Sequence, residues 1–333
     1  MTSVSVVITC YNLGAYLEEA LHSALAQTYP EVEVLVVDDG STDPATVAVL
    51  DRLPAHPRLR VLRTPNQGVA RARNYGFAQA RGEYILPLDA DDRIHPEYVA
   101  RAAAVLDACP EVGFVGCHYR LFGERQGEYR PQGYHLPDLL VENVVPIASL
   151  LRRRCWQETG GYCPELNSIE DWDLWIGIVE RGYRGAVLPE ILFEYRVRPN
   201  SNLSLVRDPD VYQRRMALLY ERHRALFDRH VYEVLRGKDR QYAILHQHMQ
   251  WLEQQVFNWE RVAREQQQAL EALSRRGAVG RWPVWRERQL ARWRRIAAEQ
   301  PTWVGRAQVV LRSLQRIARE RARLAVRRLM SRL

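Results

Sequence analysis

Short runs rich in apolar residues alternate with helix-type patterns along the first part of the chain. Runs of strand length cover residues 3–9, 32–37, 59–62 and 84–88, and apolar positions at helical spacing cover residues 16–25 and 69–80. Strands that alternate with helices fold into a parallel sheet through right-handed crossovers, with helices on both faces. The pattern therefore predicts an α/β domain with a mainly parallel sheet.

The pattern is harder to read beyond Pro96. A helix is expected from Pro96, a strand over 112–117, a helix opening at Glu170 and a last strand over 191–198. Residues 118–150 show weak periodicity and frequent Gly, Pro and Tyr. A loop of that length in a compact domain is usually functional or mobile, so this segment is expected to help shape an acceptor site.

Beyond about residue 206 only helical patterns remain. Positions spaced alternately three and four residues apart form a heptad seam: Tyr242, Leu245, Met249, Leu252, Val256, Trp259, Ala263, Gln266, Leu270 and Leu273. Such a seam is typical of a coiled coil, and equally of a helix laid across its own domain. A homo-oligomer through residues 242–273 is therefore one of two expectations.

The last segment, residues 278–333, interleaves tryptophans and aliphatic residues with arginines. From Arg275 to Leu333 there are 17 arginines and three glutamates, a net charge of +14, so the preceding residues carry −7 of the total of +7. A basic amphipathic helix is typical of a segment lying on an anionic membrane surface. Nucleic acid would attract the same residues, but the body is acidic and the tail matches no nucleic-acid module. An anionic membrane is therefore the expected partner, and nucleic acid is not.

Composition and cysteine usage indicate an ordinary globular protein in a reducing compartment. Hydrophobic residues make up 47% of the 333 residues and charged residues 26%. No apolar run has the ~20 residues of a membrane-spanning helix, and the start of the chain lacks the basic segment of a signal peptide. The five cysteines are odd in number and include no C-x-x-C pair, which indicates free thiols. We expect a cytoplasmic protein whose tail contacts the inner face of the cell membrane.

The chain is expected to divide into three parts. A sheet domain is predicted over residues 1–205, a helical, coiled-coil-like segment over 206–277 and a basic amphipathic tail over 278–333. The fold class is thus α/β, followed by an all-α C-terminal extension.

Polar side chains follow three of the predicted strands, at the point where each strand ends. They are Thr9, Tyr11 and Asn12 after the first strand, Asp38 and Asp39 after the second, and Asp89 and Asp91 after the fourth. In open α/β sheets, ligands bind outside the carboxyl ends of the strands. A tyrosine ring can stack on a base, carboxylates can accept hydrogen bonds from base or ribose, and crowded carboxylates repel one another unless a cation lies among them. Strand-end Asp and Thr are often only helix caps, but three sets at one edge favour a nucleotide crevice with a divalent metal.

Four segments, in order, resemble the motifs of family 2 glycosyltransferases with the Rossmann-like GT-A fold. They are Ser5–Asn12 (SVVITCYN), Val36–Asp43 (VVDDGSTD), Asn66–Asn74 (NQGVARARN) and Leu88–Asp92 (LDADD). The resemblance covers roughly residues 1–205. It implies inverting transfer of a sugar from a nucleotide-diphosphate donor (UDP, GDP or dTDP type) to a glycan or lipid-linked acceptor hydroxyl. It also implies a divalent cofactor, Mn²⁺ or Mg²⁺, and a role in cell-surface polysaccharide or lipopolysaccharide biosynthesis.

The resemblance also implies roles for individual residues. The nucleotide-sugar site would comprise Thr9, Tyr11, Asn12, Asp38, Asp39, Asn66, Gly68, Arg73 and Asp89. Asp91, with Asp89, would hold the metal on the diphosphate. In the pair Glu170-Asp171, Asp171 falls at the position of the catalytic base, which must take the proton of the acceptor hydroxyl. Trp172 could stack on a sugar face, and Gly161, in the turn before this pair, would lie near the acceptor.

One position departs from the family pattern. Where many relatives carry a histidine near the end of the domain, this chain has Arg198. Arginine cannot ligate a metal, but its permanently charged fork can clamp phosphate oxygens. Arg198 is therefore expected to contact the diphosphate of the donor.

Two other functions compete with the transferase. A nucleotidyltransferase also binds nucleotides on an α/β sheet, but the chain has neither a Gly-rich N-terminal loop with a basic residue, nor a G-x-G-x-x-G or G-x-x-x-x-G-K-[ST] motif. A catalytically decayed transferase could act as a scaffold at the membrane through its heptads and tail. Intact acids at Asp89, Asp91 and Asp171 favour an active enzyme.

Overall fold

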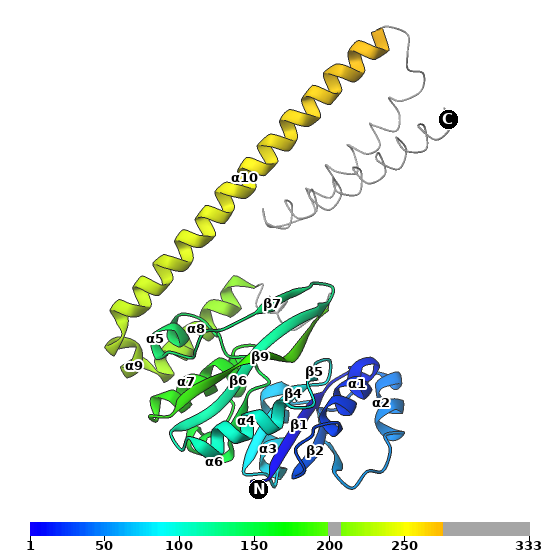
Figure 1. Ribbon diagram of the computed structural model, residues 1–333, viewed down its shortest axis with the longest axis vertical. Helices are drawn as coiled ribbons and strands as arrows, with labels where there is room; N and C mark the ends of the chain where they lie inside the picture. Colours follow the sequence, from blue (N-terminus) through cyan, green and yellow to red (C-terminus); the bar gives the residue numbers. More distant parts are fainter. Residues whose placement is uncertain (199–207, 276–333) are drawn as a thin grey trace. The chain divides into compact units, whose positions relative to one another are not determined.

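The computed structural model describes residues 1–198 and 208–275 (Figure 1). The chain divides into two compact units, Met1–Lys238 and Asp239–Leu333. The first unit holds every strand of the described residues together with helices as far as Lys238. Residues 208–238, which were expected to belong to a separate helical segment, thus belong to the unit that contains the sheet.

Four parallel strands form the half of the sheet that the sequence predicted. They lie in the order β3 (Leu59–Arg63), β2 (Val32–Asp38), β1 (Val4–Cys10) and β4 (Tyr84–Asp89). The pairings β1–β2, β1–β4 and β2–β3 are all parallel. The register sets Cys10 beside Asp38 and Thr9 beside Asp89, so the polar strand ends meet at one edge of the sheet.

The sheet continues as a mixed half. The order beyond β4 is β8 (Leu150–Arg152), β6 (Val112–Gly123), β9 (Arg184–Val197) and β5 (Arg93–Ile94), and β7 (Gly127–Tyr129) pairs with β6. Only β6–β9 is parallel among these pairings. The expectation of a mainly parallel sheet is confirmed for the half that carries the polar strand ends.

Helices cover both faces of the sheet and form two hydrophobic cores (Figure 1). On one face lie α1 (Gly14–Leu25), α2 (Pro44–Asp51) and α4 (Tyr98–Ala108). On the other lie α3 (Val69–Gln79), α5 (Leu136–Val141), α6 (Arg153–Thr159), α7 (Glu170–Glu180), α8 (Pro209–Arg222) and α9 (Arg224–Arg229), with a short 3₁₀ turn at Pro164–Leu166. Successive residues of a strand serve opposite cores: Val6 and Ile8 face the first, and Val7 faces the second.

Residues 118–150 are more regular than the sequence indicated. Strand β6 runs on to Gly123, β7 pairs back onto it, and α5 follows. The β6–β7 hairpin is held by stacked rings of Tyr119 and Tyr129, with centroids 4.9 Å apart. Because β7 is exposed on both faces, it carries no alternating apolar pattern from which a strand could be predicted.

Helix α3 packs closely on the sheet at Gly76. A Cβ built there would lie 2.5 Å from Val7 Cγ1 and 2.9 Å from Val37 Cγ2, closer than packed atoms approach. We expect Gly76→Ala to lower the free energy of unfolding by about 1–3 kcal/mol, as overpacked cores do. Urea denaturation checks this. The control is Gly127→Ala in β7, where the nearest atom lies at 3.8 Å; an equal loss in both variants would contradict close packing as the cause.

Helix α10 (Val231–Arg275) is 45 residues long, which confirms the helix expected over the heptad seam. Its Tyr242 and Leu245 side chains are more than half exposed. Whether the seam joins two chains stays a prediction, and the basic tail over 278–333 lies outside the described residues. Within residues 1–198 and 208–275, we find no helix whose length and apolarity would let it span a bilayer. All five cysteines are free thiols.

Candidate active site

The carboxyl edge of the parallel strands brings the predicted nucleotide-binding residues together. Thr9 Oγ1 donates to Asp89 Oδ1 at 3.3 Å, which links the ends of β1 and β4. Both Thr9 and Asp39 are buried, whereas the Tyr11 ring is 45% exposed and the Asn66 side chain is also exposed. Buried polar side chains, with exposed planar side chains nearby in the same loops, are suited to a base and a ribose.

Asp39 shapes the turn that leads into α3. Its Oδ1 accepts from the backbone N–H of Gln67, and its Oδ2 accepts from that of Gly68, each at 2.9 Å. Gly68 has a φ of 90°, a conformation that side chains disfavour, and a Cβ there would meet no atom within 4 Å. The turn thus exposes backbone beside open space, where a ligand could approach closely.

Asn12 and Asp38 are engaged within the loops rather than left open. Asn12, at a φ of 53°, accepts with its Oδ1 from the N–H groups of Thr42 and Asp43 at 2.8 and 2.9 Å. Asp38 Oδ1 accepts from the Ser41 N–H at 2.9 Å. The Asn12 contacts hold the β2–α2 loop against the β1–α1 loop, and the Asp38 contact lies within the β2–α2 loop.

Arg73 connects the two halves of the site. This buried guanidinium donates from Nη2 to Asp89 Oδ1 at 2.7 Å and from Nη1 to Glu170 Oε1 at 2.5 Å, and it lies over the Tyr162 ring. Burial disfavours its charge, but the carboxylates of Asp89 and Glu170 outweigh burial and raise the pKa of Arg73. The sequence located Arg73 near the nucleotide but gave no sign that it bridges to α7, because Glu170 is 97 residues away.

The acidic stretch after β4 is crowded and partly paired. Arg198 Nε contacts Asp91 Oδ2 at 2.5 Å, and Asp92 accepts from the Arg196 N–H at 2.7 Å. Burial and the charge of Asp89 raise the pKa of Asp91, while Arg198 acts in the opposite direction. Arg198, expected on the diphosphate, is thus paired with the predicted metal ligand.

The donor set is compatible with a hard divalent cation held jointly with a ligand. Among the described residues, no cluster of three or more His, Cys, Asp or Glu could hold a metal without help. Mg²⁺ sites often use only one or two carboxylates and complete their shell with substrate phosphates and water. Asp91 and Asp89 fit that arrangement. Burial and repulsion from Asp89 both raise the pKa of Asp91, and a bound cation would relieve the repulsion.

Asp171 stands at the start of α7. Its Oδ2 accepts from Asn143 Nδ2 at 3.0 Å, and its Oδ1 accepts from the Trp172 N–H at 2.8 Å. Burial and the neighbouring Glu170 charge raise the pKa of Asp171 to about 7. A carboxylate with a pKa near neutral is suited to general-base catalysis. Asn143 was missed by the sequence analysis, since it belongs to no motif.

Residues 5–168 match the family described as "Glycosyl transferase family 2". The chain belongs to this family. The match ends two residues before Glu170, so the predicted base at Asp171 lies outside the matched residues.

Relatives of this family 2 chain include bacterial glycan synthases. It is 30% identical to the chondroitin synthase of Escherichia coli over 186 residues, covering 54% of this chain and 27% of that protein. It is 27% identical over 206 residues to TuaG of Bacillus subtilis, a protein assigned to teichuronic acid biosynthesis, covering 60% of this chain and 80% of TuaG. The chain therefore spans about a quarter of the length of the synthase.

Solved structures show the same fold. A fragment of S. aureus TarS superimposes with a TM-score of 0.56 at 23% identity, covering 71% of each chain. The same protein in complex with UDP-GlcNAc gives a TM-score of 0.55 at 24% identity and covers 65% of each chain. At these identities the likeness concerns the fold, which confirms the GT-A prediction.

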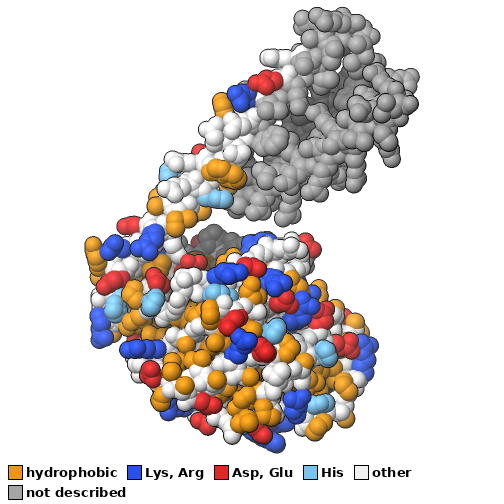
Figure 2. Space-filling model, in the orientation of Figure 1, with side chains coloured by type: hydrophobic (Ala, Val, Ile, Leu, Met, Phe, Trp, Pro, Cys, Tyr) orange, Lys and Arg blue, Asp and Glu red, His pale blue; other side chains and the backbone are white. Residues whose placement is uncertain are grey.

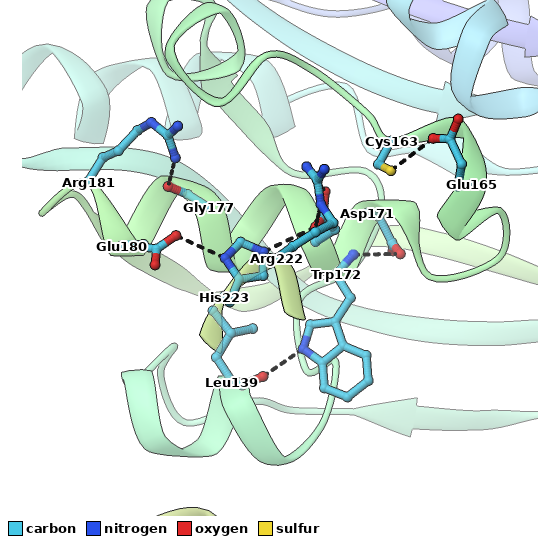
Figure 3. A network of polar contacts seen from close by, with 11 residues as sticks. Leu139, Cys163, Glu165, Asp171, Trp172, Gly177, Glu180, Arg181, Arg222 and His223 are labelled. Carbon is cyan, nitrogen blue, oxygen red and sulfur yellow. Dashed lines mark hydrogen bonds and ion pairs between the residues drawn. The ribbon is translucent and has the colours of Figure 1, made fainter. Parts of the chain in front are cut away.

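Two residues expected near the acceptor are buried in this family 2 domain. Trp172 is 4% exposed, and its indole Nε1 donates to the Leu139 carbonyl at 2.6 Å (Figure 3). In this structure it anchors α5 to α7 and presents no ring face to a sugar. Gly161, with a φ of 84°, is also buried, and a Cβ there would lie 2.6 Å from Asn74 Oδ1. Gly161 is therefore a packing residue of the turn that leads to α7.

Arg222 and His223, at the junction of α8 and α9, bind helix α7 and are called the α7 clamp below. Arg222 Nε donates to Asp173 Oδ1 at 2.7 Å, and the buried His223 ring contacts Asp173 through Nε2 at 3.1 Å and Glu180 through Nδ1 at 2.9 Å (Figure 3). Because both ring nitrogens face carboxylates, the imidazolium form satisfies both contacts. Helix α7, whose first turn holds Asp171, is thus held at Asp173 and Glu180 by residues outside the family match.

The clamp predicts a pH-dependent contribution to stability. Burial disfavours the charged His223, but Asp173 and Glu180 outweigh burial and raise its pKa above 6.5. The stabilisation is therefore complete below about pH 6.5 and is lost as the pH rises through the folded-state pKa. We expect His223→Gln to lower the free energy of unfolding by about 1.5–3 kcal/mol at pH 6 and by less at pH 9, in urea titrations.

The exposed His22 provides the control for this clamp. His22→Gln should leave the free energy of unfolding within about 0.5 kcal/mol of the parent at both pH values. A deficit of His223→Gln that does not change with pH would contradict a charged imidazole in the clamp.

Proposed function

We propose that this protein transfers a sugar from a nucleotide-diphosphate donor to an acceptor hydroxyl, with inversion at the anomeric carbon. The observation that carries the proposal is the chain of contacts Asp89–Arg73–Glu170. It ties the strand end that would hold the donor to the residue next to Asp171. Asp171 would accept the proton of the acceptor hydroxyl as that oxygen attacks the sugar, so that base and donor act on one reaction centre.

The donor site is proposed at the carboxyl edge of β1, β2 and β4. Thr9, Asp39 and Asp89 would hold the base and ribose, with Tyr11 and Asn66 at the open side. TarS, which shares the fold, has been solved with UDP and with UDP-GlcNAc. The donor nucleotide of this chain is proposed to be of the UDP, GDP or dTDP type.

Asp91, with Asp89, would hold the divalent cation, Mn²⁺ or Mg²⁺. When bound, such a cation acts as a Lewis acid that stabilises the charge of a departing diphosphate. Arg198, now paired with Asp91, is a second positive group close enough to contact the same phosphates. The residues themselves position the donor and remove the proton.

The acceptor is proposed to be a glycan or a lipid-linked glycan in cell-surface polysaccharide biosynthesis. Support comes from the relatives, among which are chondroitin synthase and TuaG. A membrane contact through 278–333 on the inner face of the cell membrane and a homo-oligomer through 242–273 belong to the same proposal. On the face shown in Figure 2, acidic and basic side chains of the described residues are interspersed, which leaves no large single-sign patch there.

Asp91→Ala provides the test of this proposal. The parent should show a rise in melting temperature with a matching nucleotide-sugar and Mn²⁺, since ligands that bind the folded state stabilise it, and it should release nucleoside diphosphate. Asp91→Ala should lose most of the Mn²⁺-dependent part of that rise and lower turnover at least about 100-fold. Both are measured by thermal denaturation across a panel of nucleotide-sugars and by nucleoside diphosphate release.

The control replaces an acid outside the site. Asp51 pairs with Arg63 on the surface, where both are more than half exposed, so Asp51→Ala should behave like the parent. Donor binding without any transfer by the parent would instead support a non-catalytic scaffold. No stabilisation by any nucleotide-sugar would contradict the donor site.

A further inference from the structure

Asn143 lies between α5 and β8, and its side-chain amide is fixed at both ends. Its Nδ2 donates to Asp171 Oδ2 at 3.0 Å, and its Oδ1 accepts from the Val145 N–H at 3.3 Å. The second contact sets which end of the amide faces Asp171, because only the oxygen can accept from a backbone N–H. The amide therefore presents a donor to the carboxylate.

The segment that carries Asn143 is itself anchored to two helices. The Leu139 carbonyl accepts from Trp172 Nε1 at 2.6 Å (Figure 3), and the Val141 carbonyl accepts from Lys238 Nζ. Asp171 and its neighbour Trp172 thus both contact the stretch 139–143. Because these hydrogen bonds hold the segment, the Asn143 side-chain donor keeps its position relative to α7 without a further conformational change.

Other charged and titratable groups also influence Asp171. They are Glu170 on the same helix, Arg73 on α3 and Tyr162 in the turn before α7. Glu170 disfavours the carboxylate form and Arg73 favours it. Arg73 acts by its charge, whereas Asn143 supplies a hydrogen bond to one defined oxygen.

We propose that Asn143 is a positioning residue of the sugar transfer, which fixes the orientation of the Asp171 carboxylate and favours its ionised form. This inference rests on the proposed function for its effect on turnover. Its effect on Asp171 itself does not depend on that function. A hydrogen bond to the charged form of an acid lowers its pKa, so the amide offsets part of the effect of burial on Asp171.

The test is Asn143→Ala in the full chain, followed in two ways. The first is the pKa of Asp171, obtained by ¹³C NMR of the aspartate carboxyl groups and assigned by comparison with Asp171→Asn. We expect it to rise by about one unit. The second is the pH profile of kcat/KM, whose acidic limb should move up by the same amount. The rate should fall about tenfold at pH 6 and recover to within about threefold of the parent at pH 9.

Two further variants keep the outcome decisive. Asn143→Gln retains an amide donor on a side chain that is one methylene longer, and it serves as the second variant if the alanine variant does not fold; its shift should be smaller. Gln132 provides the control, because it is exposed, lies in the segment before α5 and donates its side-chain amide to the Arg130 carbonyl. Gln132→Ala should change neither readout.

The readouts separate this inference from the proposed function. A raised Asp171 pKa in a protein without transfer activity would support the role of Asn143 while contradicting the transferase. An active transferase in which both Asn143 variants fold, and in which neither the Asp171 pKa nor the acidic limb moves, would overturn the inference.

Discussion

Replacing Asp171 by asparagine is expected to lower kcat by about 10²–10⁴-fold, the usual contribution of a general base. Asparagine has nearly the same shape, but its amide cannot take a proton at neutral pH. The contacts to Asn143 and to the Trp172 N–H involve one oxygen each, and the variant can keep at least one of them. The donor site lies across Arg73, so KM for the nucleotide-sugar should change little.

The same residue predicts the pH dependence of the parent. Only the ionised carboxylate can act as base, and burial together with Glu170 raises the pKa of Asp171 to about 7. The rate constant kcat/KM should therefore increase about tenfold per pH unit well below pH 7 and level off above it. An acidic limb near pH 4, the ordinary value of an aspartate, would contradict the environment described for Asp171.

Steady-state release of nucleoside diphosphate, with and without acceptor, measures both effects. The matched control is Asp173→Asn, two residues along the same helix, where the carboxylate is held by Arg222 and His223. That change should lower stability yet leave the acidic limb in place. Equal losses of kcat in the two variants would indicate that the integrity of α7, rather than the base, is being measured.

The parallel half of the fold was predictable because its strands are buried on both faces. Such strands form continuous apolar runs, and their polar ends are fixed to one edge by parallel register, as with Thr9 beside Asp89. The hairpin of β7 and the helix α5 lack that signature: β7 is exposed, and α5 has only six residues. Short elements of this kind are stabilised by tertiary contacts, such as the bond from Trp172 to Leu139.

Sequence motifs single out the candidate residues of the site but not the contacts between them. Motifs located Arg73, Asp89 and the Glu170-Asp171 pair, because each belongs to a short local pattern. The bridge through Arg73 and the contact from Asn143 join segments far apart in the chain, and no local pattern encodes them.

Trp172 is expected to stack on a sugar, because it is aromatic and follows the predicted base. In the structure the helical period turns its side chain into the core.

The second large effect concerns Arg73. Arg73→Met should lower the free energy of unfolding by about 3–5 kcal/mol, because removing one partner of a buried ion pair leaves an uncompensated charge. Here one guanidinium serves two carboxylates, and Glu170 is buried as deeply as Arg73, each with a side chain about 5% exposed. In the part of the chain that the structure describes, Glu170 Oε2 has no hydrogen-bond partner, so no neighbouring donor would compensate for the lost guanidinium. Methionine fills a similar volume, which limits the contribution of a cavity.

Urea denaturation measures this loss. The matched control is Arg63→Met, which breaks the ion pair with Asp51 at 2.5 Å on the surface, where the side chains are 51% and 58% exposed. That change should cost less than about 1 kcal/mol, since water screens exposed pairs. A deficit for Arg73→Met as small as that of the control would show that the two halves of the site are held together by packing, and that the bridge contributes only to ligand binding.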